Sequence, residues 1–247
     1  MCPKLQLTRD VAALLGENPV AARLLGIEKR AFDSFEDLIG TVLHAVAGID
    51  PELCQQVYEA SPGLADISGR DIAETARRNF EPGGAAATLL FSRGVQAILA
   101  HRVAHALWQR GDSILALAVK SVAGRAFSTD IHPAAKIGGG LWLDHGLGFV
   151  VGETCVIGED VSIWHNVTLG STLNDSGAQR HPIVHDGAVI GAGAIILGNV
   201  TVGAGANVAA GAIVVDDVPA KTLVVGCKSR TLGDAKISFT HIEDAES

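Results

Sequence analysis

Residues 190–214 read IGAGAIILGNVTVGAGANVAAGAIV, and this stretch repeats every six residues. An aliphatic residue begins each hexad, at Ile190, Ile196, Val202, Val208 and Val214. A small or aliphatic residue follows four positions later, at Ala194, Val200, Ala206 and Ala212. A period of six is neither the 3.6-residue period of a helix nor the two-residue period of a simple strand. It is typical of a parallel β-helix, in which each hexad forms one flat face of a triangular coil.

The same repeat extends back to Ile131, with two interruptions. The earlier hexads begin at Ile131, Ile137, Leu143, Val151, Ile157, Ile163, Leu169 and Val184. We expect the residues four positions later to face the interior, among them Ala135, Leu141, Cys155, Val161, Val167 and Ala188. Pro219 ends the regular pattern. The sequence thus predicts a left-handed parallel β-helix of hexapeptide repeats over residues 128–220 and a short C-terminal tail over 221–247.

Residues 1–127 carry helical patterns instead. Apolar residues at three- and four-residue spacing predict a helix over 35–46, and Pro51 suits the first turn of another. Further helices are expected over 68–80, 88–109 and 114–126. The predicted fold class is therefore α + β, with an α-helical N-terminal domain over 1–127.

A β-helix leaves the backbone groups of its first coil unpaired, and we expect the helical domain to cover them. The flat apolar faces favour packing against copies of the chain. We therefore expect a homotrimer or a dimer of trimers; the alternative is a monomer with polar faces.

The composition narrows the function classes. The 247 residues are 48% hydrophobic and 19% charged, which suits a packed core. A net charge of −8 argues against nucleic-acid or anionic-membrane partners, which need a positive field. The four cysteines show no CxxC pair, and Lys4, Arg9 and Asp10 interrupt any secretion signal. We expect a cytoplasmic protein.

The first interruption separates Leu143 from Val151 by eight residues instead of six. Two extra residues must bulge from the coil, and His145 stands at the edge of that bulge. An imidazole there can act as a general base near neutral pH if a carboxylate orients it, and Asp144 and Asp130 are the candidates. The alternative is a surface histidine in a turn.

The second interruption separates Leu169 from Val184 by 15 residues, so a loop leaves the coil over 171–182. It carries Arg180 next to His181, and a guanidinium group suits a substrate carboxylate. The alternative is an exposed loop charge without a role. The Gly- and Ala-rich stretch from 190 onward would let a long ligand lie against the backbone, although tight corners need small residues anyway.

The strings at these positions resemble serine acetyltransferases, enzymes of cysteine biosynthesis in bacteria and plants. They are DIHPAAKIG (130–138), LDHGLGFVVGETCVIGEDVSI (143–163), VTLG (167–170), RHPIV (180–184) and IGAGAIILGNVTVGAGANV (190–208). In the helical part, NPVAARLLG and the LLFSRG…HRVAHALW segment are also similar, so the resemblance covers nearly the whole chain. It implies acetyl transfer from acetyl-CoA to the hydroxyl of L-serine, which gives O-acetyl-L-serine, with no metal.

The resemblance also implies residue roles. His145 would be the general base on the serine hydroxyl, and Asp130 would orient its ring. Asp144 would hold the substrate ammonium and Arg180 the carboxylate, with His181 as a further contact. Acetyl-CoA would lie between neighbouring coils, at a site that includes Thr172, Ala192, Gly193 and Ala210, with Lys228 or Arg230 at its phosphates.

Three departures from the family pattern bear on these roles. The family places Asp-Pro before the long helix, where its carboxylate reaches the substrate amine; here residues 78–84 read RNFEPGG, so Glu81 or Asn79 takes that place. The loop STLNDSGAQ is less glycine-rich than the family version. Many members end in an isoleucine that inserts into O-acetylserine sulfhydrylase, whereas this chain ends in Ser247, which argues against that complex.

Three alternatives compete with this interpretation. The acceptor could be homoserine or another hydroxy amino acid. A zinc lyase of the γ-carbonic-anhydrase kind is also a trimeric β-helix, and three imidazoles could come from His145, His165, His181 and His185. A non-catalytic hexapeptide scaffold is the third.

Overall fold

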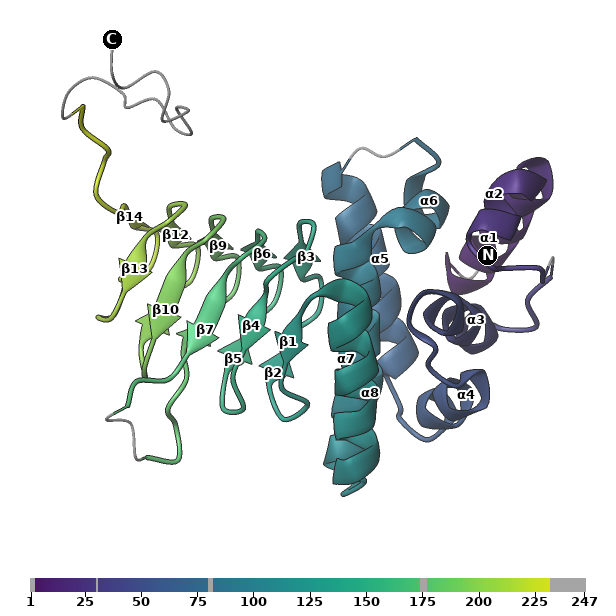
Figure 1. Cartoon of the computed structure of the whole chain (residues 1–247), viewed down its shortest axis with the longest axis horizontal. Coiled ribbons are helices and arrows are strands. Elements are labelled where there is room, and N and C mark those ends of the chain that lie inside the picture. Colours follow the sequence, from purple (N-terminus) through teal and green to yellow (C-terminus); the bar gives the residue numbers. More distant parts are fainter. Residues whose placement is uncertain (1–2, 30, 80–81, 174–176, 232–247) are drawn as a thin grey trace, which may run out of the picture.

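The computed structural model describes residues 3–29, 31–79, 82–173 and 177–231. An all-helical N-terminal part precedes a stack of short parallel strands that extends away from it (Figure 1). The helices are α1 (Pro3–Glu17), α2 (Pro19–Leu24), α3 (Phe35–Ala47), α4 (Pro51–Glu59), α5 (Leu64–Asn79), α6 (Gly84–Phe91), α7 (Arg93–Gln109) and α8 (Ser113–Phe127). No helix within these ranges has the length and apolar character that a lipid bilayer would require.

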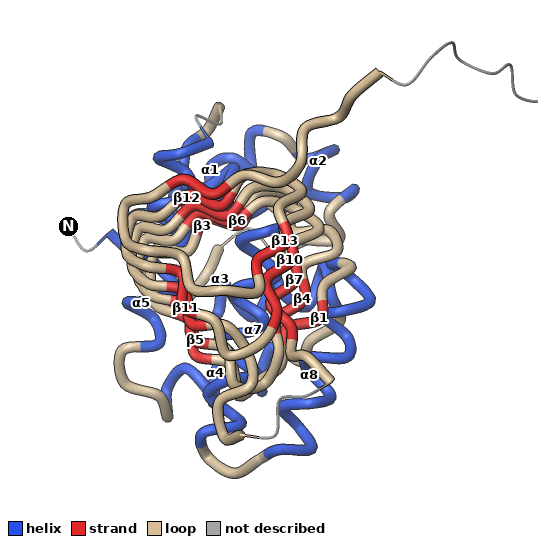
Figure 2. The backbone as a smooth tube through the Cα atoms, turned by 90° about the vertical axis from the view of Figure 1, so that its left-hand side faces the viewer, coloured by secondary structure: helices blue, strands red, loops and turns tan. Residues whose placement is uncertain are grey.

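The strands form three parallel sheets that make the three sides of a triangular coil, seen end-on in Figure 2. Sheet A contains β1 (Asp130–Ile131), β4 (Val150–Val151), β7 (Thr168–Gly170), β10 (Ile195–Leu197) and β13 (Ile213–Val214). Sheet B contains β2 (Lys136–Ile137), β5 (Val156–Ile157), β8 (Ile183–Val184) and β11 (Thr201–Val202). Sheet C contains β3 (Trp142–Leu143), β6 (Ser162–Ile163), β9 (Val189–Ile190), β12 (Asn207–Val208) and β14 (Leu223–Val224). This is the predicted left-handed parallel β-helix.

The hexad leaders stack directly on one another. Ile131 pairs with Val151, which pairs with Leu169, and the register continues through Ile196 to Val214. The residues four positions after the leaders, which the repeat assigns to the interior, are all buried. Cys155 is among them, and burial raises the pKa of its thiol to about 12. The pairing also continues past Pro219, since β14 pairs with β12.

Both interruptions leave the coil without disturbing this register. Ile131 still pairs with Val151 across the first one, and Ile157 with Val184 across the second. Each insertion therefore sits at a corner between two faces. We name the corners by the sheets they join: CA, for example residues 144–149; AB, for example 171–182; and BC, for example 185–188.

A buried ion pair covers the open end of the first coil. Arg102 on α7 donates to the carbonyl oxygens of Ile137 and of Gly138, the latter at 2.6 Å. Its Nε lies 3.0 Å from Asp71 Oδ2 on α5, and Asp71 Oδ1 accepts from the amide of Gly140 at 2.8 Å. Both side chains are almost completely buried. The expected covering of the first coil is thus achieved by charged groups that bond to its unpaired backbone.

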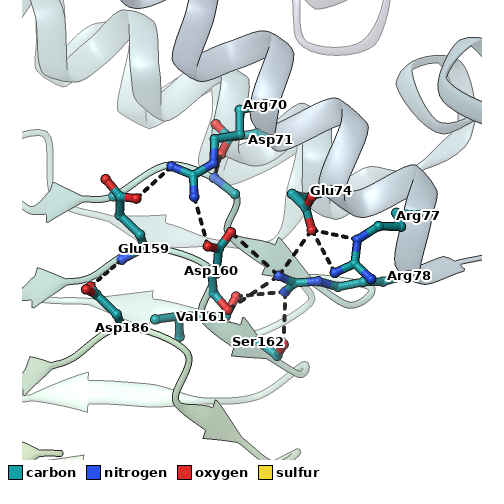
Figure 3. Close-up of polar contacts among 12 residues, drawn as sticks. Arg70, Asp71, Glu74, Arg77, Arg78, Glu159, Asp160, Val161, Ser162 and Asp186 are labelled. Carbon is teal, nitrogen blue, oxygen red and sulfur yellow. Dashed lines mark hydrogen bonds and ion pairs between the residues drawn. The ribbon is translucent and has the colours of Figure 1, made fainter. Parts of the chain in front are cut away.

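A second polar network joins α5 to the next coil at the BC corner (Figure 3). Arg70 donates to Glu159 at 2.7 Å and to Asp160 at 2.8 Å. One turn further along α5, Glu74 pairs with Arg77 and Arg78. Figure 3 shows the two arginines Arg70 and Arg78 reaching from the helix to either side of Asp160. Because this network leads directly to the end of α5, it fixes where residues 78 and 79 lie.

The helical expectations are largely confirmed, with one correction. The single helix expected over 88–109 is two helices, α6 and α7, separated by Ser92 in extended backbone (φ −83°, ψ 106°). The side chain of Gln96 donates to the carbonyl oxygens of Leu89 and Leu90, both at 2.9 Å, which compensates acceptors at the break. Propensity alone gives no sign of such a break, because it depends on the close contact of α7 with β3.

Candidate active site

The first interruption forms a bulge at the CA corner. Its six residues, 144–149, replace the four that make the next corner below, 164–167. His145 has left-handed backbone (φ 60°), as do Gly146 and Gly148. A non-glycine residue in this region is uncommon, and such strain gathers at functional sites. The Asp144 amide donates to the Ile163 carbonyl at 2.8 Å, so the bulge is anchored to the coil below.

The His145 side chain projects from this bulge. It is 66% exposed, and its Nε2 lies 3.4 Å from Asp144 Oδ2. Its ring also contacts that of His165, one coil further along the same corner, with centroids 5.7 Å apart. The Asp144 carboxylate therefore lies beside the imidazole that the sequence analysis expects to act as a general base.

A pocket of about 540 Å³ opens beside this histidine. It lies among the end of α5, the α6–α7 junction and β3, and is lined by Arg78, Asn79, Phe91, Ser92, Arg93, Trp142, Asp144, His145 and Leu147. Asn79 Oδ1 accepts from Trp142 Nε1 at 2.6 Å, and Arg78 donates to Ser162 Oγ at 3.0 Å. Asp144 supplies the carboxylate among these described lining residues, so an imidazole, an acid and two guanidinium groups share one pocket.

Sequence reasoning did not identify Arg78, Arg93 and Trp142. One signal was present: two of the three tryptophans in a chain with 4% aromatic residues adjoin hexad leaders on sheet C. These are Trp142 and Trp164, whose rings meet edge-to-face at 4.7 Å. The arginines carried no such signal, because they arrive from α5 and the start of α7.

Asp130 lies at the same end of sheet A as the bulge. Its amide donates to the carbonyl of Phe149, the last residue of the bulge, at 2.8 Å. Its carboxylate is ion-paired with Lys120 of α8 at 2.5 Å and is 61% exposed. Within one chain, the carboxylate that faces the His145 ring is thus Asp144 rather than Asp130.

The second interruption places Arg180 and His181 at the AB corner. Arg180 is ion-paired with Glu153, and this contact holds the pKa of the Glu153 carboxyl below its usual range. His181 is buried against Gly152, and its Nδ1 accepts from the amide of Thr154 at 3.2 Å. Because that nitrogen accepts a backbone N–H, the neutral ring carries its proton on Nε2.

The two interruptions therefore lie on opposite sides of sheet A: the bulge lies where its strands begin, and the loop lies where they end. The strands of sheet A, each two or three residues long, lie between them. Within one chain, Arg180 does not reach the pocket beside His145, and it is not among the residues that line it. His145 and Arg180, to which the resemblance assigns the same serine, are thus not brought together within a single chain.

The small residues form a column at the CA corner below His145. The amide of Gly193 donates to the His165 carbonyl at 3.0 Å, and that of Gly211 to the Ala192 carbonyl at 2.9 Å. A groove of about 370 Å³ follows this column and includes Trp164, Ala192 and Ala210. Of the residues assigned to acetyl-CoA, Ala192, Gly193 and Ala210 thus lie together.

The other assigned residues lie elsewhere. Thr172 belongs to the loop at the AB corner, on the far edge of sheet A. Lys228 and Arg230 are exposed beyond β14. Glu81 lies outside the described residues.

The four histidines considered for a metal occupy all three corners of the coil. His145 and His165 lie at the CA corner, His181 at the AB corner and His185 at the BC corner. In the described part of one chain, no group of three or more His, Cys, Asp or Glu side chains is placed to hold a metal ion.

Comparisons with known proteins point to one family. Serine acetyltransferase 4 of Arabidopsis thaliana is 52% identical over 145 residues, which are 59% of this chain and 41% of that protein. Serine acetyltransferase of Escherichia coli strain K12 is 43% identical over 182 residues, 74% of this chain and 66% of that protein. The matched region is thus less than two thirds of either relative. No family model matches the chain.

A solved structure extends the similarity to the helical part. The soybean serine acetyltransferase complexed with serine superposes with a TM-score of 0.81 at 38% identity, over 92% of this chain and 96% of that one. Identity at this level across both the helices and the coils goes beyond a shared fold. The chain belongs to the serine acetyltransferase family.

Proposed function

We propose that this protein transfers the acetyl group of acetyl-CoA to the hydroxyl of L-serine and so supplies O-acetyl-L-serine for cysteine biosynthesis. The observation that carries the proposal is the arrangement at the CA corner. There His145, paired with Asp144, lines a polar pocket, and a groove with small residues follows the same corner in the next coils. The pocket is the place for serine, the molecule bound in the soybean relative, and the groove is the place for a long thioester.

His145 acts as the general base in this proposal. A serine hydroxyl is a weak nucleophile, so its proton must leave as the oxygen attacks the thioester carbonyl. Such help contributes about 10²–10⁴-fold to the rate. Asp144 stabilises the imidazolium and holds the substrate ammonium, and Asp130 orients the ring once it exchanges its ion pair with Lys120. The imidazolium then returns the proton to the departing thiolate of CoA.

Acetyl-CoA lies along the CA corner in this proposal, against Ala192, Gly193 and Ala210. Corners without large side chains let its pantetheine arm approach the backbone, whose amides stabilise the negative charge that develops on the thioester oxygen. Thr172 would contact the same ligand from a neighbouring copy, and Lys228 or Arg230 would meet its phosphates.

A second copy of the chain completes the site. Arg180 and His181 lie one face away from His145, so they can serve the same substrate only if the AB corner of one copy adjoins the CA corner of another. Sheet A supports such packing, because Val150, Ile213 and Val215 are exposed along it. On the adjoining α8, Ile114 and Leu117 are exposed as well. A closed ring of three copies satisfies this head-to-tail geometry, so we propose a homotrimer, alone or paired as a dimer of trimers.

In that assembly Arg180 binds the serine carboxylate through its planar guanidinium group. His181 donates a hydrogen bond from Nε2 to the same serine. Glu81 remains a candidate for the ammonium. Thiol release from acetyl-CoA, measured with a panel of hydroxy amino acids, tests the proposal. Serine should support turnover that His145→Ala abolishes while the oligomer survives. Wild-type turnover in that variant, or no turnover with serine, would refute it.

One observation keeps a second acceptor in view. Asn79, a neutral amide, lines the pocket and is, with Glu81, one of the two candidates for the place of the family's carboxylate. A pocket with weaker demand for an ammonium group at that position could accept homoserine or another hydroxy amino acid. A higher kcat/KM for such an acceptor than for serine would establish this alternative.

A further inference from the structure

A second imidazole lies against the proposed base. His165 occupies the CA corner one coil beyond His145, and the two rings meet edge-to-face, with centroids 5.7 Å apart and planes inclined by 62°. This separation lies within the range of favourable aromatic pairs. No other histidine in the described residues has a ring contact with His145.

The backbone holds His165 rigidly in this position. Its carbonyl oxygen accepts from the backbone N–H of Gly193 at 3.0 Å. The backbone N–H of Trp164 donates to the Ile190 carbonyl at 3.0 Å, and that of Asn166 to the Leu147 carbonyl at 2.6 Å. The last bond ties the segment directly to the bulge that carries His145. The backbone at His165 is therefore held on both sides by hydrogen bonds, whereas the His145 side chain is largely exposed.

The contact with His145 does not depend on a hydrogen bond of the His165 Nδ1 atom. That atom is buried and has no hydrogen-bond partner within the described residues. An apolar residue would fill this place without leaving a polar atom unpaired, because buried polar groups are stable only when bonded. The ring that it faces is also the one that becomes charged during the proposed reaction.

We propose that His165 is a positioning residue for His145, holding its ring in the orientation from which it takes the serine proton. The inference rests on the proposed function. An edge-to-face partner restricts rotation of the exposed His145 ring, and an aromatic ring at this distance favours the imidazolium that forms. Asp144 is the charged group that faces His145 from the bulge itself, so the base lies between a carboxylate and a fixed ring.

Three variants separate this role from simple packing. His165→Ala removes the ring, His165→Phe keeps an aromatic ring without nitrogen atoms, and His185→Ala removes an exposed imidazole at the BC corner as the matched control. We expect His165→Ala to lower kcat by about 10-fold, within the range for a misplaced catalytic group, while KM for serine changes little. The acid limb of its pH–rate profile should move to lower pH. Phe should restore most of the activity, and the control should match wild type.

A readout without turnover keeps the test independent of the substrate assignment. The pKa of His145, followed by NMR of the labelled imidazole, should fall in His165→Ala and stay near the wild-type value in His165→Phe and His185→Ala. An unchanged His145 pKa together with an unchanged kcat in His165→Ala overturns the proposal. If His165→Ala does not fold, a His165→Phe variant with strongly reduced kcat and a shifted His145 pKa overturns it as well. Inactivity of the wild type on serine with the expected pKa pattern would refute the substrate and leave the positioning role standing.

Discussion

A β-carbon on Gly94 would lie 1.8 Å from the carbonyl oxygen of Leu143. Gly94 is the second residue of α7, and Leu143 immediately precedes the bulge that carries Asp144 and His145. The approach is possible because glycine has no side chain at this position. This contact therefore sets how closely α7 approaches β3, beside the pocket that contains His145.

Gly94→Ala should push α7 away from β3. Overpacking typically costs about 1–3 kcal/mol, and here the obstructing atom is backbone, which yields less than a side chain. We expect a lower free energy of unfolding by urea and a reduced kcat, since Ser92 and Arg93 line the pocket. Gly69→Ala on α5 is the control, because its nearest neighbour is Lys4 Cγ at 3.7 Å. Equal stability of the two variants would contradict the assigned contact.

The buried Arg102–Asp71 pair should be more costly to break than to replace. Asp71→Asn leaves a buried guanidinium without its counter-charge, which typically costs about 3–5 kcal/mol. Replacing both residues, as Asp71→Leu with Arg102→Met, removes the unpaired charge but leaves the first-coil carbonyls without donors. Urea denaturation should show a larger loss of stability for Asp71→Asn than for the double replacement. A loss below about 1 kcal/mol would show that the pair does not cap the coil.

Stability should fall in acid through His101. This residue is fully buried between α7 and the first coil, near Arg102, His105 and His132, and burial lowers its pKa well below 6.5. The unfolded chain therefore binds a proton that the folded chain refuses, so stability is present above pH 6.5 and declines as the pH falls. The slope is about 1.4 kcal/mol per pH unit for one group. His101→Met should flatten the decline between pH 6.5 and 5, measured by urea denaturation, while His185→Gln should not.

Gly152→Ala should dislodge His181. A β-carbon there would lie 1.9 Å from the His181 ring, which rests directly on the glycine. Gly152 has no left-handed backbone, so alanine is conformationally tolerated and the effect falls on the ring. We expect kcat/KM for serine to drop towards that of His181→Ala. Wild-type kinetics in Gly152→Ala would mean that the His181 position does not matter.

The sequence predicts the β-helix well because its register depends on local periodicity. Each leader from Ile131 to Val214 stacks as the period of six requires. The separation of the two interruptions could also have been found by counting. Leu143 is the third leader and Leu169 the seventh, so with three faces per coil the bulge follows a sheet C strand and the loop a sheet A strand. His145, the proposed base, and Arg180, the proposed ligand of the carboxylate, therefore lie at different corners.

The pocket walls could not be predicted in the same way. Arg78 and Arg93 come from the helical part, and their positions depend on packing between the helices and the coil, which the period of six does not determine. The break at Ser92 belongs to this class, because it follows from the contact of Gly94 with Leu143. Interhelical geometry of this kind overrides local propensity.

Complementation between two inactive variants tests the central claim, that His145 and Arg180 act together only across copies. His145→Ala and Arg180→Ala are each expected to be inactive as pure proteins. Co-expressed with different tags and purified as mixed trimers, they should recover about a third of the wild-type activity per site, because a ring of three that contains both variants has one interface with both residues intact. Mixed assemblies with no activity above that of the separate variants would contradict a shared site.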